Sequence, residues 1–332
     1  MDTRSLGTTG PAVGALGLGC MGMSDVYGPA DRTAGITTIH AALAAGMTLV
    51  DTGDFYGMGH NELLVAEALR GTADRDNAVL SVKFGALRDA DGGWHGFDGR
   101  PAAVKNFAAY SLQRLGVDHI DVYRPARLDP DVPIEDTVGA VKELIDAGHV
   151  RHLGLSEVGA ETIRRAAAVH PIVDLQIEYS LLSRGIESEI LATCRELGIA
   201  VTAYGVLGRG LLSGRWHAGQ ELVAGDFRAF SPRFGQENLA HNLALVEMLR
   251  ELASAKGVTA GQLAIAWVAA QGQDIIPLIG ARTTERLTEA LGALSVELTD
   301  TDLKALDAAF PEGVAAGGRY PEAMLAHLDS EK

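Results

Sequence analysis

Short apolar runs alternate with longer helical patterns along almost the whole chain of 332 residues. We expect the apolar runs to form eight strands, at residues 13–18, 48–51, 78–83, 119–123, 152–156, 174–178, 200–203 and 275–279. Helical patterns lie between them, for example at residues 33–46, 61–71, 101–116, 133–148 and 160–170. Alternation of this kind predicts an α/β protein in which helical crossovers connect parallel strands.

Eight repeats fit a closed (β/α)8 TIM barrel better than an open, doubly wound sheet. The open fold usually shows G-x-G-x-x-G after its first strand. Here the glycine-rich segment at residues 14–22, GALGLGCMG, has the wrong spacing, and no helical pattern follows it at once. Barrels of this length occur as one unit. We therefore expect residues 1–332 to form a single barrel domain.

Composition narrows the functional classes. The chain is 47% hydrophobic and 21% charged, with a net charge of −15. An acidic chain without a basic patch argues against a nucleic-acid partner. No apolar run approaches the ~20 residues of a membrane helix, and the first residues lack the apolar core of a signal peptide. A cytoplasmic location is the expectation. Cys20 and Cys194 form no C-x-x-C pair, which favours buried free thiols over a metal or redox site.

Two segments interrupt the regular alternation and follow predicted strand ends. They are residues 85–100 and 205–237, and both are rich in glycine and aromatic residues. In a barrel of this type the active site lies at the C-terminal ends of the strands. Long loops in a compact domain are usually functional or disordered, and the aromatic content favours lids. The last segment, residues 317–332, can also fold back over that face.

Three residues at these strand ends suggest acid–base chemistry. Asp51 ends the second predicted strand and Lys83 the third, so the acid and the amine can meet inside a barrel. Tyr56 lies on the loop that follows Asp51. A free phenol has a pKa of about 10, and we expect a nearby ammonium to lower it. Asp51 would keep Lys83 charged, and Tyr56 would exchange a proton with a substrate oxygen.

Each residue alone has a simpler interpretation. An aspartate at a strand end often caps the next turn, a lysine is usually solvated, and a tyrosine usually belongs to the core or its rim. Their convergence at neighbouring strand ends is what favours a catalytic group over three structural residues.

The ordered motifs of the chain resemble the aldo-keto reductase family. The resemblance rests on VDTGDFYG near residue 50 and on the strand ending KFG. It extends through GLGCMGMS (17–24), GLSE (154–157), QIEYSLLSR (176–184), LGRGLLSG (207–214) and PLIGARTTERLTEAL (277–291). The alanine of the usual D-T-A is Gly53 here. The resemblance covers essentially the whole chain and implies a nicotinamide-dependent carbonyl reductase without a metal, with Tyr56 as general acid supported by Asp51 and Lys83.

The resemblance also implies a set of cofactor-binding positions. Ser156 and Gln176 would hold the carboxamide, Tyr179 would stack on the nicotinamide ring, and Asp51 would lie close by. Gly22 and Met23 would contact the cofactor through their backbone. The remaining positions implied for the pyrophosphate and adenosine ends are Leu207, Arg209, Leu211, Gly280 and Glu289. Ala290 stands where the family commonly has asparagine, which weakens the expected adenine contacts.

The sequence adds an argument about which cofactor binds. Arg282, Thr283 and Arg286 lie within one turn at the start of a helical pattern. Two arginines and a hydroxyl at a helix N-terminus form an anion site, although a solvated helix start is the simpler interpretation. In the family this segment holds the adenosine 2′-phosphate, so NADP(H) is the expected cofactor.

The chain departs from the family at the fourth strand. Relatives usually read DLYYQHRVD, whereas this chain reads DVYRPARLDP at residues 121–130, which places Ala126 where the family has a catalytic histidine. His95, on the third loop, is a candidate substitute or a plain surface residue. We expect strand alternation to point Arg124 and Arg127 away from this position.

Two functions therefore remain open. The first is an NADP(H)-dependent reductase of small aldehydes or ketones, acting as a monomer or homo-oligomer. The second is a catalytically weak, NADPH-binding redox sensor similar to the potassium-channel β-subunits, which the missing histidine favours. The intact Asp51, Tyr56 and Lys83 favour turnover.

Overall fold

The computed structural model describes residues 1–72 and 74–332 and confirms the predicted barrel. Eight parallel strands close on themselves in the order β10-β11-β12-β3-β4-β5-β8-β9. Their bounds are β3 Gly17–Gly19, β4 Leu49–Gly53, β5 Val79–Phe84, β8 Ile120–Pro125, β9 Val150–Ser156, β10 Ile172–Glu178, β11 Ala200–Tyr204 and β12 Ile275–Gly280. Every residue of β4 and β10 is buried, as expected for strands covered on both faces.

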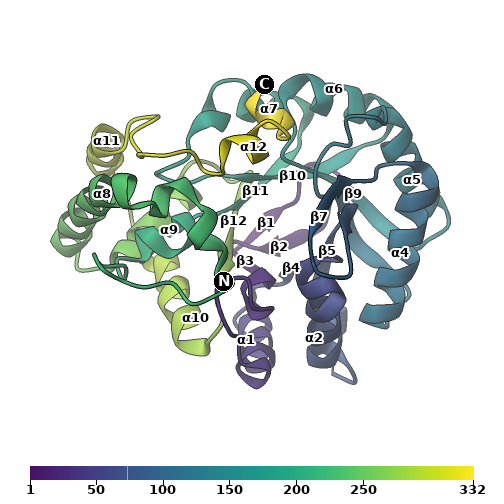
Figure 1. Cartoon of the computed structure of the whole chain (residues 1–332), viewed down its shortest axis with the longest axis horizontal. Coiled ribbons are helices and arrows are strands. Elements are labelled where there is room, and N and C mark those ends of the chain that lie inside the picture. Colours follow the sequence, from purple (N-terminus) through teal and green to yellow (C-terminus); the bar gives the residue numbers. More distant parts are fainter. Residues whose placement is uncertain (73) are drawn as a thin grey trace.

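Helices surround the barrel (Figure 1). They are α1 Arg32–Ala44, α2 His60–Leu69, α3 Asp74–Asn77, α4 Pro101–Leu115, α5 Ile134–Asp146, α6 Ala160–Val169, α7 Ile190–Leu197, α8 Gln236–Ala255, α9 Ala260–Ala270, α10 Thr284–Leu291, α11 Asp300–Ala309 and α12 Glu322–Leu325. Local sequence sets several of their ends. Asp31 caps the first turn of α1, Thr259 forms a capping box at α9, and Gly116 ends α4 in the left-handed conformation.

The N-terminal strand differs from its prediction. The apolar run 13–18 was expected to be one strand, but it is divided between β2 (Ala12–Gly14) and β3. The first of these pairs antiparallel with β1 (Thr3–Ser5) and lies outside the barrel. Val13 on the hairpin and Leu18 in the barrel wall are both fully buried, so the sequence is apolar across both strands.

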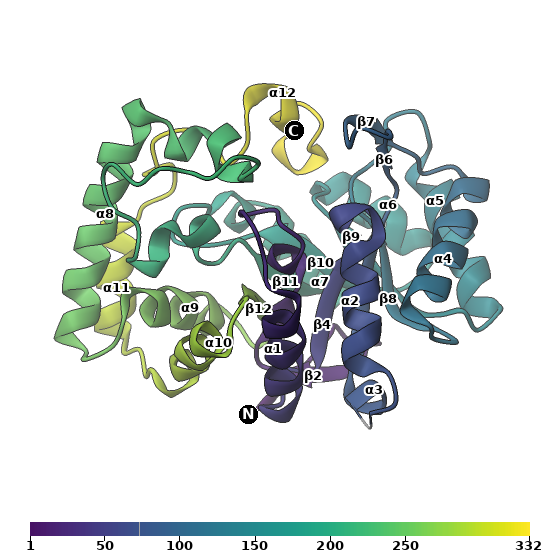
Figure 2. The ribbon, with the colours of Figure 1, turned by 60° about the horizontal axis from the view of Figure 1, so that its bottom comes forward.

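The two insertions and the tail gather at the C-terminal ends of the strands. Residues 85–100 contain an antiparallel hairpin of β6 (Ala86–Arg88) and β7 (Trp94–Phe97). The second insertion contains the 3-10 helices η4 Gly208–Ser213, η5 Phe227–Phe230 and η6 Pro232–Phe234. Figure 2 shows the tail with α12 at the end of the molecule opposite the N-terminus. The prediction that the tail folds back over the barrel is confirmed, because Arg319 contacts Glu157 at the end of β9.

Both cysteines, Cys20 and Cys194, are buried and free, as predicted. In the part of the chain that the structure describes, no helix has the length and hydrophobicity that a membrane crossing requires.

Candidate active site

Asp51 and Lys83 meet inside the barrel, near the C-terminal ends of β4 and β5. Lys83 Nζ donates to Asp51 Oδ1 at 2.5 Å and to the Thr52 carbonyl at 3.1 Å. The other carboxylate oxygen of Asp51 accepts from Ser81 Oγ and Gln176 Nε2, each at 2.7 Å. Because either charge would be costly to bury alone, the two buried charges stabilise each other. The predicted pairing of Asp51 with Lys83 is confirmed.

Arg124 extends this network into the barrel. Its Nη1 donates to Asp51 Oδ2 at 3.2 Å, and its Nη2 donates to both oxygens of Asp174 at 2.7 and 2.8 Å. The expectation that Arg124 points away from the site was wrong. Arg124 is in register with Lys83 on the neighbouring strand, and residues in register on adjacent strands face the same side of a sheet.

Tyr56 lies above the pair, where η2 (Tyr56–Gly59) follows β4. Lys83 Nζ is 5.1 Å from the centroid of the phenol ring. Among the described residues, the Tyr56 hydroxyl has no hydrogen-bond partner. Gly57 and Met58 both adopt positive φ, 55° and 52°. That conformation is unfavourable for methionine, and strain of this kind often accompanies a functional residue held in a fixed position.

The protonation of Tyr56 differs from the prediction. Burial raises the pKa of the Tyr56 phenol well above its ordinary value, the charge of Asp51 raises it further, and Arg127 opposes the rise. Burial also lowers the pKa of Lys83, an effect that Asp51 opposes. The expectation of a lowered Tyr56 pKa was wrong, because burial and the charge of Asp51 outweigh the effect of nearby cations. Tyr56 therefore stays protonated at neutral pH, the state of a proton donor.

Arg127 lies just past the end of β8 and reaches the barrel mouth. Its Nη2 lies 3.4 Å from the Tyr320 hydroxyl, which is 2.9 Å from the hydroxyl of Tyr204. Its guanidinium carbon is 6.0 Å from the Tyr320 ring centroid. Because the residue lies beyond the end of β8, strand alternation does not fix the direction of its side chain.

The tail closes one side of the mouth through a buried ion pair. Arg319 donates from Nη1 to Glu157 Oε1 at 2.9 Å and from Nη2 to Glu157 Oε2 at 2.5 Å. Glu157 also accepts from the Tyr204 hydroxyl at 2.7 Å. Although burial opposes ionisation, the charge of Arg319 lowers the pKa of Glu157 to about 2. Arg209 donates to the Arg319 carbonyl at 2.6 Å, so the second insertion holds the tail.

The predicted carboxamide positions lie close to Asp51. Ser156 ends β9, in register with Gln176 on β10. The Ser156 hydroxyl oxygen is buried and has no hydrogen-bond partner in the described structure. A buried polar atom without a partner is rare. An amide group bound beside Ser156 would satisfy it, so this position fits a nicotinamide carboxamide.

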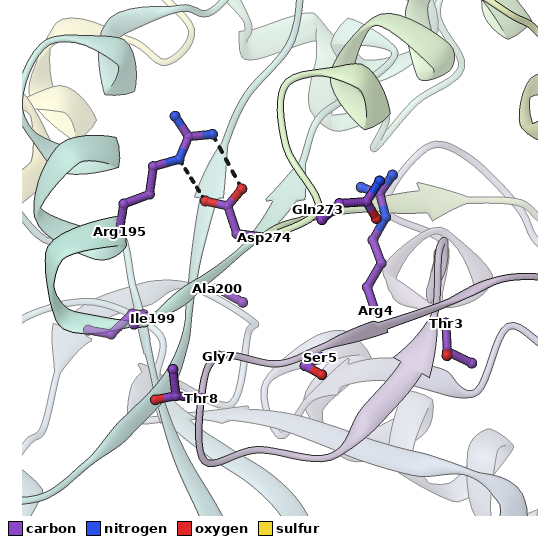
Figure 3. Close-up of a pocket in the computed structure, with 11 residues that line it drawn as sticks. Thr3, Arg4, Ser5, Gly7, Thr8, Arg195, Ile199, Ala200, Gln273 and Asp274 are labelled. Atoms are coloured by element: carbon purple, nitrogen blue, oxygen red, sulfur yellow. Dashed lines mark hydrogen bonds and ion pairs between the residues drawn. The ribbon is translucent and has the colours of Figure 1, made fainter.

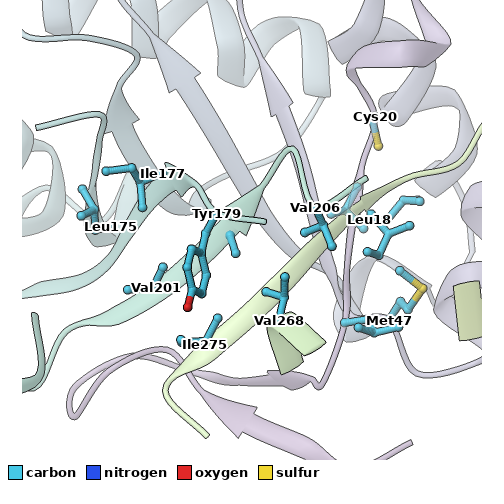
Figure 4. Packing of buried hydrophobic residues seen from close by; sticks show 14 of the residues in the cluster. Leu18, Cys20, Met47, Leu175, Ile177, Tyr179, Val201, Val206, Val268 and Ile275 are labelled. Carbon is cyan, nitrogen blue, oxygen red and sulfur yellow. The ribbon is translucent and has the colours of Figure 1, made fainter. Parts of the chain in front are cut away.

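Tyr179 does not fit its predicted role. The side chain is 1% exposed, its ring centroid lies 5.3 Å from that of Trp267, and its hydroxyl donates to Glu187. Figure 4 shows the ring among apolar side chains such as Val201 and Ile275. A ring with no exposed face cannot stack on a ligand. Tyr204, at the end of β11, is the tyrosine that the barrel presents at its mouth, and its position at a strand end was the signal that could have found it.

The other predicted cofactor positions surround the first and seventh strand ends. Gly22 and Met23 belong to η1 (Met21–Met23), directly after β3, and a Cβ on Gly22 would lie 3.5 Å from the Arg282 side chain. Leu207 is partly buried before η4, whereas Leu211 is fully buried in the core. Leu211 can therefore reach a ligand only through its backbone.

The predicted anion site at α10 contains an excess of positive charge. Thr283 caps the helix, and its hydroxyl accepts from the Arg286 backbone N–H. Arg282 donates to the carbonyls of residues 27–29, while the Arg286 guanidinium has no hydrogen bond or ion pair within the described chain. Partial burial and the charges of Arg282, Arg215 and Arg228 lower the pKa of Arg286. A phosphate would relieve this repulsion, so the site fits one.

Gly280 and Glu289 lie at the two sides of this site. Gly280 ends β12, and a Cβ built there meets no atom within 4 Å. Glu289 accepts from Arg215 at 2.5 Å. Among the described residues, no three His, Cys, Asp or Glu side chains are grouped as a metal site requires.

His95 does not substitute for the family histidine in this structure. Its side chain is 61% exposed and its Nε2 lies 2.7 Å from Asp89 in the same hairpin. Ala126 is buried beside β5, where its backbone N–H donates to the Phe84 carbonyl at 2.8 Å.

A separate hollow lies at the opposite end of the barrel. It is lined by the N-terminal hairpin and the starts of β11 and β12, with the ion pair of Arg195 and Asp274 at its edge (Figure 3). This end carries none of the residues around Tyr56, in keeping with the general division between a stabilising and a catalytic face in such barrels.

Comparison with known proteins agrees with this geometry. The chain is 42% identical over 321 residues to the "Probable aldo-keto reductase 1" of Glycine max, covering 95% of this chain and 90% of the relative. A glycerol dehydrogenase from Gluconobacter oxydans has a similar structure, with a TM-score of 0.85 and 29% identity over 93% of this chain and 94% of its own. The holo form of an aldo-keto reductase from Bacillus halodurans gives a TM-score of 0.76 and 27% identity, covering 97% and 99% of the two chains.

Residues 15–310 match the family model described as "Aldo/keto reductase family". This range includes all eight barrel strands and the three residues at their mouth, Asp51, Tyr56 and Lys83. The chain therefore belongs to the aldo/keto reductase family, whose members are carbonyl oxidoreductases.

Proposed function

We propose that this protein is an NADP(H)-dependent oxidoreductase that reduces aldehyde or ketone groups of small molecules or oxidises the corresponding alcohols. The observation that carries the proposal is the buried Asp51–Lys83 pair directly beneath Tyr56, at the C-terminal ends of neighbouring strands. The name of the Gluconobacter relative, a glycerol dehydrogenase, supports including the oxidative direction.

In this proposal each residue has a distinct task. Tyr56 donates a proton to the developing alkoxide, and its raised pKa keeps that proton available at neutral pH. Lys83 stabilises the resulting phenolate, and Asp51 holds the ammonium in place. When bound, the nicotinamide would supply or accept the hydride. Ser156 and Gln176 would orient its carboxamide, while Gly22, Met23, Leu207, Arg209, Leu211, Gly280 and Glu289 would line the remaining length of the cofactor.

The preference for NADP(H) rests on the arginines at α10. We expect Arg286→Ala to weaken NADPH binding by about 10- to 100-fold, because a charge-assisted hydrogen bond is worth about 1.5–3 kcal/mol. The affinity for NADH, which lacks the 2′-phosphate, should change little. Titration of both cofactors by fluorescence or calorimetry measures the two dissociation constants. Arg286 is a cleaner test than Arg282, whose removal also frees the carbonyls of residues 27–29.

Arg151→Ala provides the matched control, since Arg151 is exposed at the opposite end of β9. It should bind both cofactors as the wild type does. Equal losses of NADPH and NADH affinity in Arg286→Ala would mean that Arg286 does not recognise the 2′-phosphate.

An activity screen tests the proposed reaction itself. NADPH consumption is followed with a panel of aldehydes, ketones and sugars, and NADP⁺ reduction with the corresponding alcohols. Steady turnover of at least one class supports the enzyme. Tight NADPH binding without turnover across the panel would instead favour the regulatory, sensor-like function.

A further inference from the structure

Arg127 differs from three other arginines at the barrel mouth, Arg319, Arg209 and Arg233, because it has no ion pair with an acid in the part of the chain that the structure describes. Arg319 pairs with Glu157, and Arg209 and Arg233 lie 3.5 and 3.4 Å from the carboxylate of Glu178. Within the described residues, Arg127 has no ion pair. Its guanidinium donates to the Ala126 carbonyl at 2.6 Å and lies near the Tyr320 hydroxyl. The charge of Glu157 favours the guanidinium, but that carboxylate is already bound by Arg319, so Arg127 keeps donors free for a ligand.

The position of Arg127 places this charge close to the reacting groups. The Ala126 backbone N–H donates to the carbonyl of Phe84, the residue after Lys83. The chain therefore reaches the barrel mouth beside β5, the strand that carries Lys83. The charge of Arg127 lowers the pKa of Lys83 and opposes the rise at Tyr56, which places both within its electrostatic reach.

An aromatic wall lies on another side of Tyr56. The Phe55 ring centroid is 4.8 Å from that of Tyr56 and 5.6 Å from that of Trp94, which stands on β7. Trp94 is 56% exposed. One face of its ring is covered by the Arg88 guanidinium, 4.3 Å from the ring centroid. Ligand pockets are lined mainly by hydrophobic and aromatic side chains. The mouth therefore offers an apolar surface and, at Arg127, a guanidinium without a direct ion pair among the described residues.

We propose that Arg127 binds a carboxylate of the carbonyl substrate and so selects for keto acids or aldehyde acids that also carry an apolar body. This inference rests on the proposed reductase function. Arginine is suited to the role because its planar guanidinium can hold a carboxylate with two parallel hydrogen bonds. The chain as a whole carries a charge of −15, so an anionic substrate needs such a local cation to be held.

An alternative task for Arg127 is to polarise the reacting carbonyl in place of the missing histidine. The two tasks differ in what they predict. A group that binds a carboxylate discriminates between an acid and its ester, whereas a group that acts on the carbonyl affects both alike.

The test uses two matched pairs of substrates with NADPH: phenylglyoxylate and its methyl ester, and 3-formylbenzoate and its methyl ester. For at least one pair, wild-type kcat/KM should be about tenfold or more higher for the acid. In Arg127→Met the loss of kcat/KM on that acid should exceed the loss on its ester by about 10- to 100-fold. Arg127→Lys, which keeps the charge but not the planar fork, should recover part of the acid activity.

Arg151→Met serves as the control for loss of an arginine. It should leave kcat/KM unchanged for both the acid and the ester. Circular dichroism and thermal unfolding check that Arg127→Met is folded; if it is not, Arg127→Lys carries the comparison. Two results would overturn the proposal. One is an equal loss of kcat/KM on acid and ester in Arg127→Met, and the other is a wild type whose kcat/KM is not higher for the acid in either pair.

Failure of the proposed function can be told apart from failure of this inference. If the wild type reduces none of the four compounds, calorimetry measures the binding of 3-formylbenzoate and its ester to the NADPH-loaded protein. Tighter binding of the acid that is lost in Arg127→Met supports the carboxylate site without turnover. Indistinguishable binding of acid and ester refutes it.

Discussion

Tyr56→Phe should lower kcat for carbonyl reduction by about 10²–10⁴, the range typical of a positioned general acid. The dissociation constant for NADPH should stay within a few-fold of the wild type, because the hydroxyl acts on the substrate oxygen. The fold should also be unaffected, since the hydroxyl has no hydrogen bond to lose among the described residues. Steady-state NADPH consumption and cofactor titration measure the two effects separately.

Tyr110→Phe is the matched control. Tyr110 is 58% exposed on α4, and the loss of its hydroxyl should leave kcat and cofactor affinity unchanged. A kcat for Tyr56→Phe within a few-fold of the wild type would remove Tyr56 from the mechanism, even if the protein proved to be a reductase.

The second large effect concerns stability. Asp54 follows β4 and is 8% exposed, and neither of its side-chain oxygens has a hydrogen-bond partner in the described structure. Burial, assisted by the charge of Glu62 and opposed by that of Arg114, raises its pKa to about 7. The backbone N–H groups of Phe55 and Gly85 approach the carboxylate but only partly offset its burial.

The sign of the pH dependence follows from the raised pKa. Below about pH 4 the carboxyl is protonated in both the folded and the unfolded chain, so it imposes no penalty. Between about pH 4 and pH 7 the unfolded chain loses its proton first, and the free energy of unfolding falls. The rise of the Asp54 pKa from 3.8 to about 7 lowers the free energy of unfolding by about 4 kcal/mol over this window.

Asp54→Asn cannot ionise and should escape this loss. Its stability relative to the wild type should increase by about 2 kcal/mol between pH 5.5 and pH 8, the part of the window above pH 5.5. Urea unfolding at several pH values measures the difference. Asp118→Asn, an exposed aspartate near the end of α4, should show no such trend. A difference between Asp54→Asn and wild type that did not change with pH would contradict the raised pKa.

The sequence was sufficient to predict the barrel and the centre of the site. Strands in an α/β protein are buried on both faces, so their apolar runs stand out between helical patterns. The C-terminal ends of neighbouring strands lie side by side in a barrel, which is why the contact between Asp51 and Lys83 could be predicted. The hairpin at the N-terminus was missed because β2, which packs at the end of the barrel, and β3, which lies in the barrel wall, both contain buried residues. Buried residues give the same apolar pattern in either place.

The mouth of the barrel was less predictable. Arg319 and Tyr320 reach the site through a tail whose path depends on contacts with β9 and β11, and no local pattern encodes that path. Tyr179 and Tyr204 both follow buried strands, but only the structure shows which ring is enclosed by the core. The raised pKa of Tyr56 depends on burial, which a motif does not reveal.

The ion pair between Glu157 and Arg319 has a consequence for biosynthesis. The two residues are 162 positions apart in the chain. At a typical translation rate, Arg319 is polymerised roughly 8 to 30 seconds after Glu157. During that interval the Glu157 carboxylate lacks its ion-pair partner, so β9 cannot reach its final electrostatic environment while the tail is still missing. The ion pair at the barrel mouth can therefore form only after all eight barrel strands have been synthesised.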